Sequence, residues 1–176
     1  MRASYTVVAL LIAAAVPAMA QNFPIMKAGQ WETSTTTSKS ANGPLAKITM
    51  CTDEAIQRQM MDMSKGMQRE MCSKSDNRRD GDKFIGDSVC QMGESKMTSH
   101  SVMTIQGDIA YKAAISTTYD PPFMGMKDSS ATVEGKYVGP CRDGLQPGDV
   151  VMPDGRKMNM KSMQGQAPAM PPPKSK

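Results

Sequence analysis

Methionine is the residue whose abundance and spacing most clearly suggest chemistry in this chain. The sequence has 19 methionines in 176 residues, and residues 60–71 read MMDMSKGMQREM. A thioether sulfur is a soft donor that suits Cu(I). Methionine also fills irregular gaps in hydrophobic cores, because its side chain is unbranched and adaptable. The stretch is therefore either a soft-metal site or the apolar face of a helix.

The spacing of these residues favours a helix. At about 100° per residue, five apolar side chains fall in one stripe about 80° wide, namely Ile56, Met60, Met63, Met67 and Met71. Charged side chains fall on the opposite side, and Met61 lies off the stripe. Thr52 can cap the helix, and Asp53 and Glu54 place negative charge in its first turn, where the helix dipole favours it. We predict one amphipathic helix that ends near Cys72 and packs this stripe into the core.

Methionines outside the helix keep a second function open. Periplasmic Cu(I) binding through thioethers is the alternative, and its candidate ligands are Met158, Met160 and Met163 near the C-terminus and Met124 and Met126 in a loop. Methionines in a tail are not needed for a core, so they are better candidates than those of the helix. The favoured prediction nevertheless includes no metal and no cofactor.

The residue types that catalysis needs are scarce. His100 is the only histidine, and the strand pattern places it on a polar face. No GxSxG motif supplies a nucleophilic serine, and the glycines form no phosphate-binding loop. Asp53 and Glu54 are better explained as helix-start acids than as a catalytic pair. We therefore predict that the protein is not an enzyme and has no catalytic residue.

The four cysteines predict two disulfides. Cys72 and Cys90 lie symmetrically about Gly81 in the turn DGD, so a hairpin places them opposite each other, at about the 5.5 Å Cα separation that a disulfide tolerates. Cys51 and Cys72 flank the helix, and a helix of about 19 residues holds its ends roughly 28 Å apart. We predict the pairs Cys72–Cys90 and Cys51–Cys141. A metal site is the weaker interpretation, because the cysteine spacings do not match one.

The N-terminus has the pattern of a signal peptide. Arg2 precedes an apolar run at residues 7–16, and Ala18-Met19-Ala20 is a typical cleavage sequence. The run is shorter than the roughly 20 residues that span a bilayer. We predict a signal peptide at 1–20, a periplasmic or secreted protein after cleavage following Ala20, and no transmembrane segment in the mature chain.

The rest of the chain predicts a single α+β domain. Alternating segments at 31–37, 45–50, 73–79, 83–91, 97–105, 109–119 and 131–138 indicate about six or seven antiparallel strands, with the helix inserted after the second. Pairing Ile105 with Ile109 sorts apolar and polar residues onto opposite faces. We expect a curved meander sheet with the helix packed on its apolar face, or else a closed barrel. The domain covers residues 21–152, and 153–176 is a flexible tail rich in Met, Pro and Lys.

Several short motifs together resemble a known family. KAGQWETSTTT resembles the Gly-x-Trp-Glu opening strand of a bacterial secreted family, domain of unknown function 3617. CTDE resembles its first cysteine and helix start, Cys72 and Cys90 follow in similar order, and VGPC resembles its Gly-x-Cys close. The likeness covers about residues 26–141, and Gln30 departs from the leucine expected before the tryptophan. The resemblance implies a periplasmic or secreted location and no activity.

Charge and architecture together favour a binding protein. The formal net charge of +4 is small, and Arg78-Arg79 is the main basic pair, so we expect no nucleic-acid partner. A pocket could open between a curved sheet and its helix. The leading prediction is a non-enzymatic, envelope-associated module that binds an apolar ligand, a lipid or a protein partner.

Overall fold

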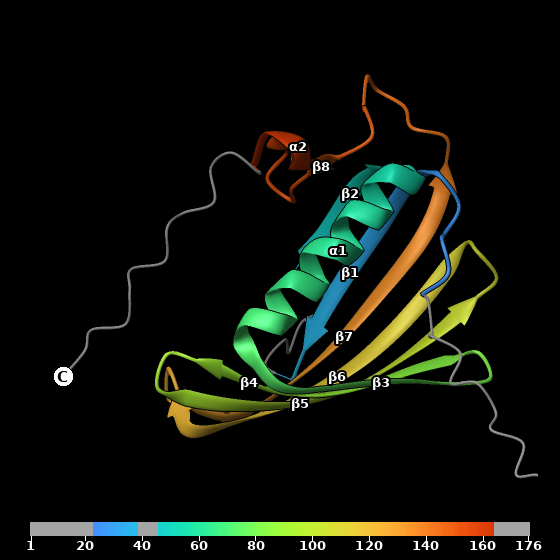
Figure 1. Cartoon of the computed structure of the whole chain (residues 1–176). Coiled ribbons are helices and arrows are strands. Elements are labelled where there is room, and N and C mark those ends of the chain that lie inside the picture. Colours follow the sequence, from blue (N-terminus) through green and yellow to red (C-terminus); the bar gives the residue numbers. More distant parts are fainter. Residues whose placement is uncertain (1–22, 39–45, 164–176) are drawn as a thin grey trace, which may run out of the picture.

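The computed structural model describes residues 23–38 and 46–163. Within them the chain forms one nine-stranded antiparallel sheet in the order β3-β4-β5-β6-β7-β1-β2-β8-β9, with a single long helix, α1 (Figure 1). The elements are β1 (Gly29–Thr37), β2 (Ala46–Thr52), α1 (Glu54–Met71), β3 (Cys72–Asp80), β4 (Lys83–Met92), β5 (Ser95–Gln106), β6 (Ala110–Phe123), β7 (Met126–Gly139), β8 (Asp149–Val151), β9 (Lys157–Asn159) and α2 (Met160–Met163). The α+β class and the helix after the second strand are confirmed. The sheet is open rather than a barrel.

The sheet has nine strands, which is more than the predicted six or seven. Strands β8 and β9 are the additions, and β9 and α2 lie inside the segment that the sequence analysis assigned to a tail from residue 153. Asp149 holds this hairpin, because its carboxylate accepts hydrogen bonds from Gln146 N at 2.8 Å and Asn159 Nδ2 at 2.7 Å. A three-residue strand has no detectable period, so the pattern missed both. The remaining tail residues and the predicted signal peptide lie outside the described residues.

The pairing of β5 with β6 differs from the predicted register by two residues. Ile105 lies opposite Tyr111, and the turn takes up Ile109, whose residue surface is 49% exposed. Because the shift is even, the two faces keep their predicted composition. Met103 and Ala113 share the face toward α1, whereas His100 and its neighbours lie on the outer face.

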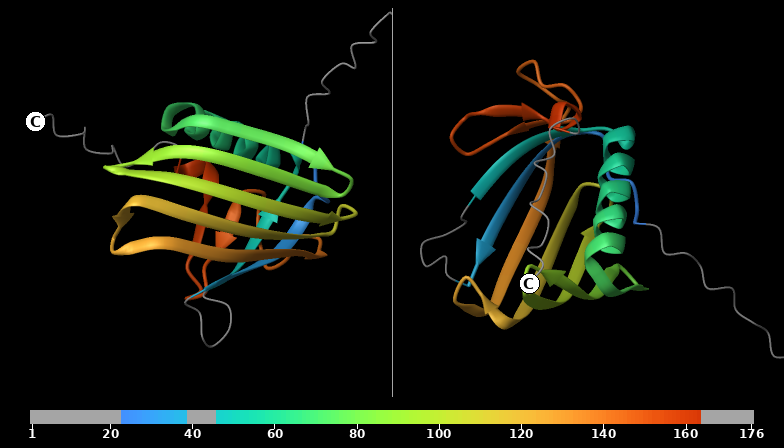
Figure 2. Two further views of the ribbon diagram at one scale, coloured as in Figure 1. Left: turned by 90° about the horizontal axis from the view of Figure 1, so that it is seen from below. Right: turned by 60° about the vertical axis from the view of Figure 1, so that its left-hand side comes forward.

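Helix α1 crosses the concave side of the sheet. It connects β2 to β3, which are separated by five strands in the sheet. The helix therefore runs across the hollow of the sheet from β2 to the edge formed by β3 (Figures 1 and 2). Its N-cap is Asp53, whose carboxylate accepts from Ile56 N at 2.8 Å, and not Thr52 as predicted. A carboxylate at this position also interacts favourably with the helix dipole.

Both ends of α1 are held by a disulfide. Cys51 is bonded to Cys141 with a Cα separation of 5.6 Å, and Cys72 to Cys90 with one of 3.7 Å. Both predicted pairings are confirmed. Two disulfides indicate an oxidising, extracytoplasmic environment. Within the described part of the chain, no helix is long and apolar enough to cross a membrane.

The predicted core stripe of α1 is only partly buried. Ile56 is 1% exposed, and Met60 and Met71 are half-buried. Met63 and Met67 are 49% and 54% exposed, so the prediction that they belong to the core is wrong. The helix is anchored at its two ends, whereas the curved sheet leaves its middle without close apolar cover. The buried apolar residues cluster instead around the start of the helix and on the inner face of the sheet, and they are Met26, Trp31, Cys51, Ile56, Cys90, Ala113 and Leu145.

Candidate functional site

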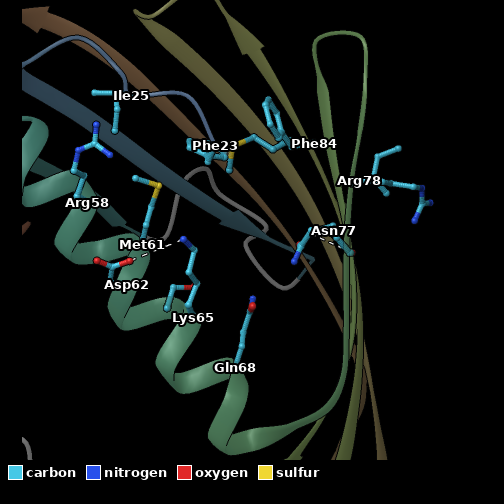
Figure 3. A pocket seen from close by; sticks show the side chains of 15 residues that line it. Phe23, Ile25, Arg58, Met61, Asp62, Lys65, Gln68, Asn77, Arg78 and Phe84 are labelled. Atoms are coloured by element: carbon cyan, nitrogen blue, oxygen red, sulfur yellow. Dashed lines mark hydrogen bonds and ion pairs between the residues drawn. The ribbon is translucent and has the colours of Figure 1, made fainter. Parts of the chain in front are cut away.

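A cleft of about 620 Å³ separates α1 from the concave face of the sheet. Figure 3 shows side chains from the helix on one side and from β3 and β4 on the other, with the N-terminal segment above. Its lining residues are Phe23, Ile25, Arg58, Met61, Asp62, Ser64, Lys65, Gln68, Asn77, Arg78, Phe84, Ile85, Gly86, Ser101 and Met103. The volume lies within the range of about 300–1,000 Å³ that is typical of small-molecule sites.

One part of this cleft is apolar and aromatic. The rings of Phe23 and Phe84 lie 5.1 Å apart, and the Arg79 guanidinium lies 5.0 Å from the Phe84 ring centroid. Met61 on the helix and Met103 on β5 complete this region. Phe84 and Met103 are directly opposite in the β4–β5 register, so the sheet itself aligns them.

Another part of the cleft is polar, and its charges are arranged in pairs. Arg58 forms an ion pair with Glu54 one turn earlier, and Lys65 Nζ lies 3.9 Å from Asp62 Oδ1. The carboxamide of Gln68 accepts from Ser75 Oγ at 3.2 Å. This part of the cleft therefore combines hydrogen-bonding groups with locally balanced charge.

A second, smaller cavity of about 160 Å³ lies near the start of the helix. Mainly apolar side chains line it, and the full set is Phe23, Pro24, Met26, Trp31, Met50, Thr52, Gln57, Met60, Met61 and Tyr111. Phe23 and Met61 line both cavities. The apolar part of the cleft therefore lies next to a second, mainly apolar pocket near the start of the helix.

The N-terminal segment forms one wall of both cavities, and the helix fixes its position. Gln57 bonds the Met26 backbone twice, accepting from N at 2.7 Å and donating to O at 2.9 Å. Trp31 Nε1 donates to Lys27 O at 2.9 Å, and Lys27 N donates to Asp108 O at 2.8 Å. These bonds tie the segment to α1, to β1 and to the β5–β6 turn.

An aromatic cluster supports the inner wall of the small cavity. Trp31 is 3% exposed, and its ring lies 6.0 Å from those of Tyr111 and Tyr137. Tyr111 lies over Gly135 on the neighbouring strand, and a Cβ at Gly135 would collide with the tyrosine ring. Glycine is therefore required there for the ring to lie flat on the sheet.

The predicted alternative metal ligands do not form one cluster. Met124 is 83% exposed and Met126 half-buried, and both lie at the β6–β7 turn, whereas Met158 and Met160 lie at β9 and α2 on the opposite side of the molecule (Figures 1 and 2). The side chain of Met163 falls outside the described residues. Among those that are described, no three His, Cys, Asp or Glu side chains could together hold a metal ion. Cu(I) binding stays a prediction.

His100 lies outside the cleft, on the outer face of the sheet. Its Nδ1 is 2.6 Å from Asp87 Oδ1, and Arg78 Nη1 is 2.6 Å from Asp87 Oδ2. Hydrogen bonds from His100 and then from Arg78 lower the pKa of Asp87 below its ordinary value. The cluster links three adjacent strands, β3, β4 and β5.

Sequence reasoning missed the residues that join the two cavities. The helical period places Met61 off the apolar stripe and so predicts no role for it, yet it is the helix residue that lines both cavities. Phe23 precedes the first strand and received no role. An apolar residue on the otherwise polar side of an amphipathic helix was the available signal for Met61.

The fold and the cleft define a class of small α+β protein in which one disulfide-anchored helix bridges an open, curved antiparallel sheet. The chain belongs to the family described as protein of unknown function DUF3617, whose match covers residues 26–141. The matched region contains β1 to β7, α1 and all four cysteines, and it ends at Cys141. No curated protein and no solved structure matches the chain significantly. The family prediction is confirmed, while bacterial origin and secretion stay predictions.

Proposed function

We propose that this protein is a non-catalytic binding module that holds an amphipathic small molecule, such as a single-chain lipid, between α1 and the concave face of the sheet. The observation that carries the proposal is that Phe23 and Met61 line both a cleft of about 620 Å³ and a neighbouring, mainly apolar pocket of about 160 Å³. The apolar pocket suits an alkyl or aromatic group, and the polar part of the cleft suits a head group that accepts and donates hydrogen bonds.

The side chains of the cleft support binding rather than catalysis. On the helix, Arg58 forms an ion pair with Glu54, and Lys65 forms one with Asp62. His100 is on the other face of the sheet with Asp87. Methionine suits such a wall, because its flexible thioether can repack around ligands of different shape.

The proposed place of action is the periplasm or the extracellular space. The two disulfides support this location, because such bonds persist in oxidising compartments. The predicted signal peptide at residues 1–20 agrees with it. An amphipathic ligand would come from the envelope itself or from the surrounding medium.

Binding of the uncharged fluorophore N-phenyl-1-naphthylamine tests the proposal. The wild-type protein is expected to raise its fluorescence in a saturable way. Met61→Glu places a charged, hydrated group where the two cavities meet and is expected to weaken binding roughly tenfold or more, because an apolar ligand group can no longer pack against an apolar side chain there.

Met67→Glu is the matched control. It makes the same substitution on the same helix, at a residue that is 54% exposed and lines neither cavity. Binding by this variant is expected to equal that of the wild type. Absence of saturable binding by the wild type, or equal loss in the two variants, would contradict the proposal.

A further inference from the structure

Strand β3 forms one margin of the sheet in the described part of the chain. It pairs only with β4, and Figure 2 (left) shows it along the edge. Residues 73–80 are all exposed. An edge strand leaves a row of backbone N–H and C=O groups free to pair with another strand. The β3 edge is therefore a surface that a strand of a partner can extend.

The charges along β3 are self-complementary about its middle. Lys74 and Asp80 are equally far from Asn77, and so are Asp76 and Arg78. If a second copy pairs antiparallel with its Asn77 opposite this one, Lys74 faces Asp80 and Asp76 faces Arg78, each twice. Because side chains alternate along a strand, all four project from the same face of the sheet. Opposite charges at facing positions stabilise an antiparallel pair.

Within one chain most of these charges lack a partner. Among the described residues, Lys74, Asp76 and Asp80 form no ion pair. Asp76 lies directly opposite Asp87 in the β3–β4 register, so the facing side chain has the same sign. Like charges at such positions are unfavourable. A cation supplied by a second copy would reduce the repulsion between Asp76 and Asp87.

Arg78 is placed to supply that cation. It is bound to Asp87 within its own chain at 2.6 Å, and in the antiparallel arrangement it also faces Asp76 of the second copy. The segment from residue 73 to residue 80 contains no large apolar side chain, which favours a partner of matching charge order over an apolar peptide.

We propose that two copies of this chain associate through antiparallel pairing of their β3 strands about Asn77. The two sheets become one continuous sheet across a two-fold axis. Because the side-chain contacts are exposed and charged, the association weakens as the salt concentration rises. The inference is independent of what the cleft binds.

Sedimentation equilibrium with charge variants tests this proposal. The wild type is expected to show a monomer–dimer equilibrium that weakens with added salt. Lys74→Asp and Asp80→Lys each replace two attractive pairs with two repulsive ones, so self-association is expected to fall roughly tenfold or more in each. In an equimolar mixture of these two variants, only the mixed pair has opposite charges at both ends of the interface, because one copy carries two acids and the other two lysines. Heterodimers are therefore expected.

The double variant Lys74→Asp/Asp80→Lys exchanges the two charges and is expected to self-associate as the wild type does. Lys127→Asp, which makes the same charge change on β7, is the control and is expected to leave the equilibrium unchanged. A wild type that is monomeric at every concentration overturns the proposal. So does a dimer that the two single variants leave intact, which would place the interface elsewhere.

Hydrogen exchange gives a second measurement that needs no variant. Amides of β3 whose N–H groups face outward are expected to become more protected as the protein concentration rises, while those of the β6–β7 turn do not change. Concentration-independent exchange along β3 in a dimeric sample would contradict pairing through this edge.

Discussion

Cys51 lies three residues before the first residue of helix α1 and Cys72 directly follows its last residue, and each forms a disulfide with a distant part of the sheet. Cys51 is joined to Cys141, which follows β7, and Cys72 to Cys90 on β4. The helix is thus fixed at both ends, and its middle can stand off the sheet. This arrangement keeps a cleft open in a protein whose core is small.

The two disulfides are expected to differ in their effect on stability. The residues of Cys51–Cys141 are 90 apart in sequence and those of Cys72–Cys90 are 18 apart. Loop-closure entropy gives about 4 to 5 kcal/mol for the longer loop and about 3 kcal/mol for the shorter one, as upper values. Urea unfolding of the Cys51→Ser/Cys141→Ser and Cys72→Ser/Cys90→Ser variants measures the difference. A greater loss from the second variant would contradict this order.

Gly135 is expected to tolerate no side chain. In Gly135→Ala the new methyl group meets the Tyr111 ring, which also stacks on Trp31 and whose hydroxyl lies 3.4 Å from Thr33 Oγ1. Overpacking of this kind typically costs about 1–3 kcal/mol. Gly66→Ala is the matched control, because a Cβ there meets nothing within 4 Å and the residue lies inside a helix. It is expected to stabilise by up to about 1 kcal/mol. Thermal unfolding is expected to show a lower melting temperature for Gly135→Ala and an equal or higher one for Gly66→Ala, each relative to the wild type.

The position of the helix and the pairing of the cysteines can be predicted from the sequence for physical reasons. The methionine spacing has the helical period, and the two cysteines placed symmetrically about Gly81 follow from hairpin geometry. A curved sheet is expected from the sequence, but how closely it approaches the middle of the helix is not, because that depends on how nine strands twist together. For that reason the exposure of Met63 and Met67 was not foreseen. Met61 is recognisable in the sequence as an apolar residue on the polar side of the helix, but its place in both cavities is not, since that depends on which side of the helix faces the cleft.

Acid is expected to weaken the link between β3, β4 and β5. The pKa of Asp87 is lower in the folded protein than its ordinary value, first because of His100 and then because of Arg78. A lowered folded-state pKa contributes stability that is present above the unfolded value, about 3.9, and is lost as the pH falls through the folded value. The free energy of unfolding of Asp87→Asn is therefore expected to fall below that of the wild type near neutral pH and to approach it in acid.

Urea unfolding between neutral pH and about pH 3 measures this difference. Asp128→Asn, at an exposed aspartate of β7 that forms no ion pair among the described residues, is the control. It is expected to follow the wild type at each pH. A gap between Asp87→Asn and the wild type that stays constant with pH would show that the carboxylate charge is not what links the strands.

Photocrosslinking with a single-chain lipid that carries a diazirine in its alkyl chain tests the central claim most directly, because it reports where the ligand lies. Peptide mapping is expected to find label on α1 near Met61, on the N-terminal segment near Phe23 and on the facing strands near Phe84 and Met103, and Met61→Glu is expected to lose it. Label confined to the outer face, or equal labelling of the wild type and Met61→Glu, would contradict the account.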